Sequence, residues 1–321
     1  MKSLWCAILL IIFIQSPGYS GISIDELRKT VVFVRMQSQE MTRVNDKSAE
    51  LWYRFPNTKD YSPMIKTETG SGFIIQHNNH NYLVTAKHLA ESSLPASEII
   101  MNVNGKGSTI TLQALAGANR GAHWFHHPKT DISIYPLTYP NLKADVLSLP
   151  ECFFPKQEAE IRLLTAAYIV GFPLGLGVQE KLSPIAKEAK IASRLTFIKG
   201  NQLPAFLLDQ ALSQGYSGAP VFYEDMIPGA AVGGWSGRGG ATLHLLGLQS
   251  SALSDKTGGK ISVVIPIAYI WDILESDEFK SYERELARNN TLAGPCPFSP
   301  LSQTEKQLGE NHDLASERTV R

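Results

Sequence analysis

Three residues of the 321-residue chain, His88, Asp131 and Ser217, have the side-chain types that nucleophilic catalysis requires. A serine hydroxyl has a pKa far above 7, so it needs a neighbouring base of near-neutral pKa to accept its proton. Histidine is such a base, and a carboxylate on its far ring nitrogen fixes the tautomer. Alone, Ser217 is about as well explained as a turn residue, whereas His88 is more often a capping or surface residue and Asp131 more often a turn residue. Together they form a candidate catalytic triad.

Ser217 lies in the most informative segment, Gln214–Pro220, which reads Gln-Gly-Tyr-Ser-Gly-Ala-Pro. Its two glycines permit a tight turn in which two backbone N–H groups point at one spot, as a developing oxyanion requires. The second glycine follows the serine directly and a predicted strand comes next, so this is not the G-x-S-x-G elbow of α/β-hydrolases. Taken alone, a Gly/Ser hairpin turn explains the segment about as well.

The other two residues lie at the ends of predicted strands. His88 follows the apolar run Tyr82–Thr85, and Asp131 opens the alternating segment Asp131–Tyr135. Residues at these positions can project into a cleft. The chain order His, Asp, Ser is that of chymotrypsin-type barrels and differs from that of subtilisins and α/β-hydrolases.

Short apolar segments separated by Gly, Pro and polar turns predict an all-β architecture. The predicted strands are Thr30–Arg35, Gly70–Ile75, Tyr82–Thr85, Ser108–Leu115, Asp131–Tyr135, Ala167–Val170, Ala189–Phe197, Val221–Tyr223, Leu243–Leu248 and Ser262–Ile265. One helix is predicted from Pro266, a favoured first-turn residue, to Arg288. Residues 37–68 are interpreted as a long surface excursion, and residues 289–321 as a flexible tail.

The composition argues against several functions. Thirty basic and thirty acidic residues give a formal net charge of zero, so we expect neither nucleic-acid binding nor a polybasic membrane surface. Clustered histidines at 77, 80, 123, 126 and 127 lack acidic or cysteine partners at zinc-site spacing. They are interpreted as solvated loop residues, and we predict no metal site and no cofactor. The oligomeric state is left open.

Residues 1–20 have the pattern of a secretory signal peptide. A short basic start precedes the apolar run Leu4–Ile14, and the small residues Gly18 and Ser20 predict cleavage before Gly21. An uncleaved anchor is the alternative, but the run is short for a membrane span. The expected mature protein is exported, periplasmic or secreted, without a membrane span.

Two local patterns leave alternatives open. Cys152 and Cys296, which remain after the predicted cleavage, either form one disulfide or stay separate thiols, and the sequence favours neither. The segment Asn289–Thr291 formally matches a glycosylation acceptor, but three-residue matches are frequent by chance.

In combination, the motifs resemble the trypsin-like serine proteases of the chymotrypsin fold, and among them the HtrA-type protease domain. The resembling segments follow the family's order: Gly70–Ile75, Val84–His88, Asp131–Ile134, Val170–Gly177, Asp209–Pro220, Gly247–Ser250 and Val264–Pro266. The resemblance implies a protease domain over residues 21–288, built from two six-stranded antiparallel β-barrels. Barrel 1 would cover about 27–150, barrel 2 about 159–266 and a C-terminal helix about 266–288, with the site in the cleft between the barrels.

The resemblance also implies roles for individual residues. His88 would be the general base, Asp131 would orient it, and Ser217 would be the nucleophile that forms an acyl-enzyme. The backbone N–H groups of Gly215 and Ser217 would form the oxyanion hole.

Ala211 and Ser250 are the implied substrate-binding positions. Ala211 lies six residues before the nucleophile, where the family places the base of the pocket for the side chain preceding the cut. An uncharged base predicts cleavage after small or medium apolar residues, with Asp209 as the main source of error.

The chain departs from the family pattern at Tyr216, where an Asp or Asn is usual. Because Tyr216 cannot pair with a newly cut N-terminus, zymogen activation by that route is not expected. No PDZ domain is expected, and the excursions 37–68 and Gly229–Gly240 are insertions without an assigned role. An active exported endopeptidase is the main hypothesis, and by the resemblance its expected partners are protein or peptide substrates. A catalytically inactive binding protein of the same fold and a non-proteolytic acyl hydrolase are the alternatives.

Overall fold

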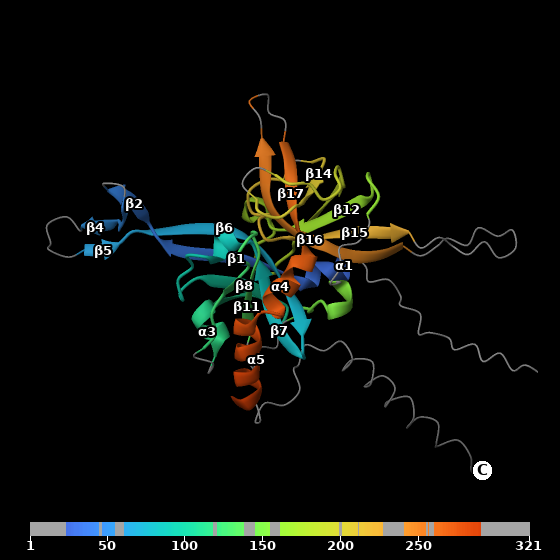
Figure 1. Ribbon diagram of the computed structural model, residues 1–321. Coiled ribbons are helices and arrows are strands. Elements are labelled where there is room, and N and C mark those ends of the chain that lie inside the picture. Colours follow the sequence, from blue (N-terminus) through green and yellow to red (C-terminus); the bar gives the residue numbers. More distant parts are fainter. Residues whose placement is uncertain are drawn as a thin grey trace, which may run out of the picture.

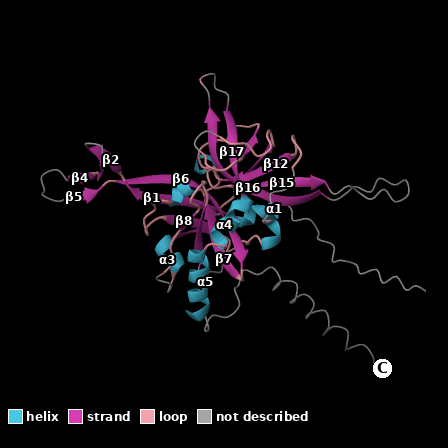
Figure 2. Ribbon diagram, viewed as in Figure 1, coloured by secondary structure: helices cyan, strands magenta, loops and turns pink. Residues whose placement is uncertain are grey.

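A computed structural model of the chain describes residues 24–44, 47–54, 61–117, 121–137, 145–154, 161–198, 201–210, 212–226, 241–254, 256 and 260–289 (Figure 1). Strands dominate the described chain and helices are few and short (Figure 2). The predicted all-β class with a C-terminal helix is confirmed. In this part of the chain, no helix is both long and apolar enough to cross a membrane.

The strands are β1 Val31–Gln39, β2 Met41–Val44, β3 Lys47–Glu50, β4 Trp52–Arg54, β5 Tyr61–Pro63, β6 Ile65–His77, β7 His80–Thr85, β8 Glu98–Val103, β9 Lys106–Thr111, β10 Phe125–His126, β11 Ser133–Leu137, β12 Ala166–Gly171, β13 Ile185–Lys190, β14 Phe206–Leu208, β15 Pro220–Met226, β16 Ala241–Ser254 and β17 Lys260–Pro266. The α-helices are α1 Ile24–Leu27, α2 Lys87–Ala90, α3 Leu112–Ala116, α4 Ile270–Leu274 and α5 Asp277–Asn289. Four 3₁₀ turns complete the list: η1 Arg28–Thr30, η2 Glu151–Phe153, η3 Pro173–Gly175 and η4 Ile267–Tyr269.

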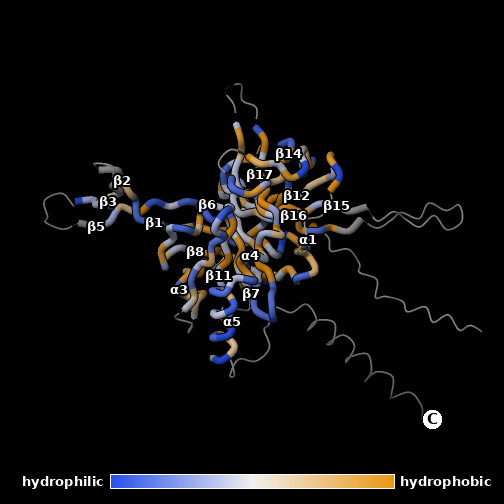
Figure 3. Tube along the Cα trace, viewed as in Figure 1, coloured by the Kyte–Doolittle hydropathy of each residue, from blue (hydrophilic) through white to orange (hydrophobic). Residues whose placement is uncertain are grey.

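The strands form two main antiparallel sheets. The first has the order β10-β11-β7-β6-β1-β8-β9 and the second the order β13-β12-β15-β16-β17-β14. The first sheet has one strand more than the six expected, because the two-residue β10 pairs with β11. One apolar core lies against the first sheet and reaches the second, and a smaller core lies within the second sheet. In Figure 3 the apolar segments concentrate in this central body.

The segment 37–68, expected to be an irregular excursion, forms strands. β1 and β6 extend past the sheet as a long hairpin, in register from Val31 opposite Phe73 to Gln39 opposite Ile65. Beyond its end, β2–β3 and β4–β5 form two small two-stranded sheets. The result is an arm that projects from the body (Figure 1).

Two other predicted elements differ because side chains cap helices. The strand predicted over Ser108–Leu115 ends at Thr111, whose hydroxyl accepts a hydrogen bond from Ala114 N and caps α3. The helix predicted from Pro266 is divided into η4, α4 and α5. Ser276 separates the last two, since its hydroxyl accepts from Phe279 N at the start of α5.

The last helix, α5, packs on the first sheet. Phe279, Tyr282 and Leu286 are buried at helical spacing. The Phe279 ring lies 5.3 Å from that of Tyr82 in β7 and 5.0 Å from that of Phe125 in β10. Most of the remaining residues of α5 are hydrophilic (Figure 3). The helix therefore covers the strand that leads directly to His88.

Several sequence predictions lie outside the described residues. These are the signal peptide, Ala211, the Gly229–Gly240 insertion, Cys296 and the tail from residue 290 onward. Cys152 is exposed in η2, and its pairing with Cys296 stays a prediction.

Candidate active site

His88 and Asp131 are joined twice. β7 ends at Thr85, and the extended Ala86 turns the chain into α2, which carries His88. His88 Nδ1 lies 2.8 Å from Asp131 Oδ2, and the His88 backbone N–H donates to Oδ1 over 2.8 Å. One carboxylate thus holds both the ring and the backbone of the histidine. With the proton on Nδ1, the Nε2 lone pair is available as a base.

Asp131 is presented by a turn that His127 organises. The His127 ring is 1% exposed, and its Nδ1 accepts hydrogen bonds from the backbone N–H groups of Lys129 and Thr130, each over 3.1 Å. Nε2 consequently carries the proton, which it donates to Asp272 Oδ2 in α4 over 2.9 Å. The interpretation of His127 as a solvated loop residue was therefore wrong.

The other clustered histidines also have structural partners. His77 Nδ1 lies 2.8 Å from Glu151, and His126 Nδ1 lies 2.7 Å from Ser133 Oγ. His123 Nε2 lies 3.3 Å from Glu278 in α5. Within the described ranges, no group of three or more His, Cys, Asp or Glu residues has the arrangement of a metal site.

The pKa values of the pair shift in opposite directions. Burial lowers the pKa of His88, but its hydrogen bond to Asp131 and the charges of Asp131 and Glu68 outweigh this, so the pKa lies above its usual value. Burial raises the pKa of Asp131, but the contacts with His88 and Ser250 outweigh it and lower the pKa. The geometry favours an ionised carboxylate beside a histidine that readily accepts a proton.

Ser250 connects Asp131 to Ser217. It is the extra residue of a bulge in β16, because Gln249 faces Val264 and Ser251 faces Val263. Its hydroxyl donates to Asp131 Oδ2 over 2.5 Å, and its carbonyl accepts from Ser217 Oγ over 3.3 Å. In the described chain no hydrogen bond joins Ser217 to His88.

The loop around Ser217 requires its glycines. Gly215 has φ +95° and Gly218 has φ +80°, in the region that favours glycine. A Cβ on Gly215 would lie 2.3 Å from the Phe172 carbonyl oxygen, and one on Gly218 would lie 2.2 Å from that of Ser71. No other residue fits these two positions without moving the backbone. The turn predicted from the sequence is therefore present.

The direction of the Gly215 N–H follows from its neighbour. The Gln214 carbonyl accepts a hydrogen bond from Leu174 N over 2.7 Å. Since C=O and N–H of a trans peptide point in opposite directions, the Gly215 N–H points away from Leu174. Among the described residues, neither Gly215 N–H nor Ser217 N–H has an acceptor. Within the described part of the chain, both donors are therefore available to a ligand oxygen.

Tyr216 fills the space beneath this loop. Its side chain is buried in the smaller core with Ala219, and burial raises the pKa of its hydroxyl. A Cβ on Gly171 would lie 2.9 Å from the Tyr216 ring. Apolar packing of Tyr216 thus supports the loop.

The predicted specificity loop is anchored at the two residues that precede Ala211. Asp209 Oδ1 accepts from Lys190 N over 2.8 Å, so this carboxylate is engaged at the end of β13. The Gln210 carbonyl accepts from the buried Ser262 Oγ over 2.7 Å.

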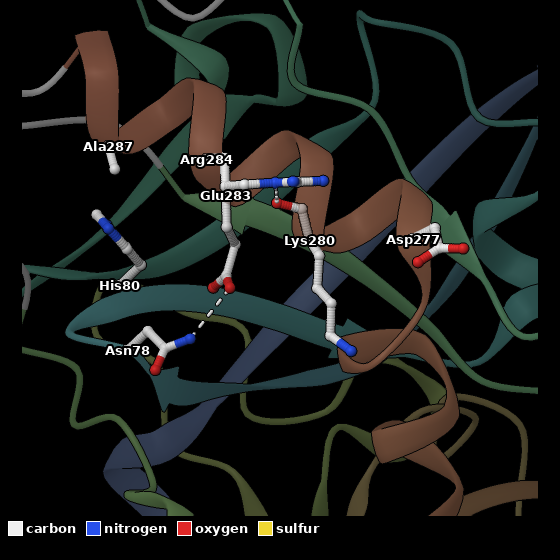
Figure 4. A pocket seen from close by; sticks show the side chains of 7 residues that line it. All are labelled: Asn78, His80, Asp277, Lys280, Glu283, Arg284 and Ala287. Carbon is white, nitrogen blue, oxygen red and sulfur yellow. Dashed lines mark hydrogen bonds between the residues drawn. The ribbon is translucent and has the colours of Figure 1, made fainter.

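A hollow of about 540 Å³ lies between the β6–β7 turn and α5, apart from these residues (Figure 4). Charged and polar side chains line it, including His80, Lys280 and Arg284. Glu283 accepts hydrogen bonds there from Asn78 and Tyr82. Its contacts attach α5 to the first sheet, and no residue of the predicted triad reaches it.

Comparison with known proteins identifies the class. The profile of the trypsin-like peptidase domain matches residues 70–233, half of the chain, and the chain belongs to this family. A search of curated proteins found no match. Solved structures similar to the chain include Rv3671c from M. tuberculosis H37Rv, as the inactive form of a serine-to-alanine mutant. It shares 14% identity, with a TM-score of 0.40, over 77% of this chain and 85% of that one. The MamO protease domain from Magnetospirillum magneticum shares 15% identity, with a TM-score of 0.40, over 64% and 88%.

Proposed function

We propose that the protein is an exported serine endopeptidase with His88, Asp131 and Ser217 as its triad. The observation that carries this proposal is the doubly bonded His88–Asp131 pair beside a loop whose Gly215 and Ser217 N–H groups have no acceptor among the described residues. A family fold alone does not require this combination, because function depends on the site.

The mechanism follows from the positions of the donors and acceptors. Ser217 Oγ attacks the scissile carbonyl carbon and its proton passes to His88 Nε2. The carbonyl oxygen becomes negative and accepts hydrogen bonds from the N–H groups of Gly215 and Ser217. His88 then donates the proton to the leaving amine, and water hydrolyses the acyl-enzyme through the same base. Asp131 stays ionised throughout and stabilises the imidazolium, in keeping with its lowered pKa.

One observation favours a second candidate, an inactive binding protein of the same fold. Ser217 Oγ donates to the Ser250 carbonyl and not to His88. For an active enzyme, the hydroxyl must rotate toward His88 when substrate binds. Catalytic hydrogen bonds are often long or misaligned before substrate binds, which is why we place the active enzyme first.

A fluorophosphonate label combined with casein cleavage tests the proposal. Wild type should be labelled and should cleave casein, whereas Ser217→Ala and His88→Ala should lose several orders of magnitude in turnover. The double variant should be no worse than either single one, because the residues act as a unit. Ser213→Ala, an exposed serine of the same segment, is the matched control and should behave as wild type.

The remaining outcomes separate the alternatives. A wild-type protein that is neither labelled nor active would be a binding protein, and labelling without peptide cleavage would indicate an acyl hydrolase. Near-normal turnover in Ser217→Ala would exclude Ser217 as the nucleophile.

Export is the part of the proposal that rests on residues 1–20. The small residues Gly18 and Ser20 support cleavage before Gly21. N-terminal sequencing of the mature protein should begin at Gly21 or within a few residues of it. A mature chain that begins at Met1 would contradict export by cleavage.

A further inference from the structure

Ser71 is a buried residue of the first sheet whose polar groups contact the second half of the molecule. It lies in β6 and is fully buried. Its backbone N–H donates to the Ser217 carbonyl over 2.8 Å, and its hydroxyl donates to the Gly215 carbonyl over 2.7 Å. The hydroxyl also accepts from Phe172 N, which follows β12, over 3.0 Å. A single residue therefore joins the sheet that carries His88 to the loop that carries Ser217.

These contacts fix the peptide planes around the two free N–H donors. Gly215 lies between two planes: Leu174 N holds the carbonyl of the preceding one, and Ser71 Oγ holds the carbonyl of the following one. Ser217 likewise lies between planes whose carbonyls are held by Ala219 N and Ser71 N. Because glycine rotates freely on its own, the orientation of the Gly215 N–H depends on these bonds.

We propose that Ser71 is a positioning residue for the oxyanion hole. Its hydroxyl holds the plane that follows Gly215 while Leu174 N holds the plane that contains the Gly215 N–H, and together they keep this N–H directed at the oxygen of the scissile carbonyl. This inference rests on the proposed protease function and extends it to a residue that touches neither substrate nor the reacting atoms. The role matters in this chain because Tyr216 supports the loop by packing alone and brings no charge that could form an ion pair.

A purely structural hydrogen bond is the competing explanation. It would stabilise the fold without changing the chemical step. An oxyanion donor acts in the transition state more than on bound substrate, so its misplacement lowers kcat and leaves KM nearly unchanged. The split between kcat and KM distinguishes the two explanations.

Ser97 provides a matched control. It is also a fully buried serine, and its hydroxyl also makes one accepting and one donating bond to the backbone, both to Gln37. Ser71→Ala and Ser97→Ala therefore remove the same atoms from equally buried sites. Only Ser71 contacts the loop around Ser217.

The experiment measures kcat, KM, the rate of fluorophosphonate labelling and Tm for both variants. Removing one oxyanion donor lowers kcat by about 100- to 1,000-fold, so loosening one should lower it by about 10- to 100-fold. We expect this loss in Ser71→Ala at unchanged KM, with a parallel loss in labelling rate. Ser97→Ala should keep kcat within about twofold at a similar fall in Tm.

Further variants keep the test decisive. Ser71→Thr retains the hydroxyl and should recover most of kcat where it folds. Should Ser71→Ala not fold, Ser71→Cys replaces the hydroxyl by a weaker thiol donor and should show the same split at smaller amplitude. Equal kcat in the Ser71 and Ser97 variants would overturn the inference while the protease function stands. An inactive wild type would overturn the protease function first, and the inference with it.

Discussion

Ser250 Oγ donates a 2.5 Å hydrogen bond to Oδ2 of Asp131, the oxygen that also lies 2.8 Å from His88 Nδ1. The sequence suggested a substrate-binding role for Ser250, and that role stays a prediction. The structure adds a contact that the sequence did not predict. Two donors on one carboxylate oxygen stabilise its charged form and limit its rotation.

We expect Ser250→Ala to lower kcat by about 10- to 150-fold, because a hydrogen bond to a charged group contributes about 1.5–3 kcal/mol. Asp131→Asn should lower kcat by about 10⁴-fold, since an amide favours the wrong histidine tautomer. Ser251→Ala, the exposed neighbour on β16, is the control and should leave kcat unchanged. Steady-state kinetics on a peptide substrate measure all three. Equal kcat in Ser250→Ala and Ser251→Ala would show that the contact with Asp131 has no catalytic role.

The raised pKa of His88 predicts the pH dependence of catalysis. Only neutral His88 acts as a base, so kcat/KM should rise with pH through a pKa above the ordinary 6.5. The charge of Glu68 contributes to the raised pKa of His88. Glu68→Gln should therefore move the rising limb of the kcat/KM–pH profile to lower pH. Glu50→Gln, an exposed position on the arm, should not move it. If the rising limb of the wild-type kcat/KM–pH profile had its midpoint at or below pH 6.5, the inferred His88–Asp131 contact would be contradicted.

The same shift has a defined effect on stability. A histidine whose pKa is raised on folding contributes its full stabilisation below the unfolded pKa, and this is lost as pH rises through the folded value. For the His88–Asp131 pair, the contribution therefore decreases above pH 6.5.

Ser217 and Ser71 show which parts of the site could be predicted from the sequence and which could not. Ser217 has a local pattern, with glycines on both sides and a strand behind it, so the site loop was predictable. Ser71 donates a hydrogen bond to Gly215, which lies 144 residues away in the sequence. His127 donates one to Asp272, which lies 145 residues away. No pattern near either residue reveals such a contact.

The arm was missed for a different physical reason. The strand periodicity used for prediction arises when one face of a strand is buried. Trp52, Tyr53 and Arg54 of β4 are all exposed, so their residue types do not alternate. Backbone pairing forms this strand without a hydrophobic pattern. Several strands of the two main sheets were predictable because they bury at least one face, as β1, β7, β12 and β17 do. β8, β10 and β14 were not among the predicted strands, and the strand predicted over 189–197 overlaps β13 only at its end.

Tyr82 offers a test of how α5 is held. Its hydroxyl donates to Glu283 Oε1 over 2.8 Å, and burial together with Glu283 raises the pKa of Tyr82. Tyr82→Phe should lower the free energy of unfolding by about 1.5–3 kcal/mol, since it leaves a largely buried carboxylate short of one donor. Tyr168→Phe, whose hydroxyl donates to Glu224 over a longer 3.3 Å at a less buried site, should cost less. Urea denaturation measures both, and equal losses would contradict the proposed attachment.

Substrate preference tests the specificity loop. The resemblance puts Ala211 at the base of the pocket for the residue before the cut, and Asp209 is the charged residue nearest to it in sequence. Asp209 is bonded to the Lys190 backbone N–H, and Ser262 holds the neighbouring Gln210 carbonyl. Both contacts oppose a shift of the loop that would bring the carboxylate to the pocket.

We therefore predict cleavage after Val, Ala, Leu or similar residues. An uncharged pocket leaves a buried Lys or Arg without a partner at a cost of several kcal/mol, whereas an apolar side chain gains about 1.5–3 kcal/mol on full burial. A peptide library incubated with the mature enzyme measures the preference directly. Asp209→Ala should leave the profile unchanged, as should the control Asp145→Ala, whose carboxylate accepts from Gly105 N in the first half of the chain. A profile dominated by cleavage after Arg or Lys would overturn the assignment of Ala211. If that basic preference were then lost in Asp209→Ala and kept in Asp145→Ala, Asp209 would be the residue at the base of the pocket.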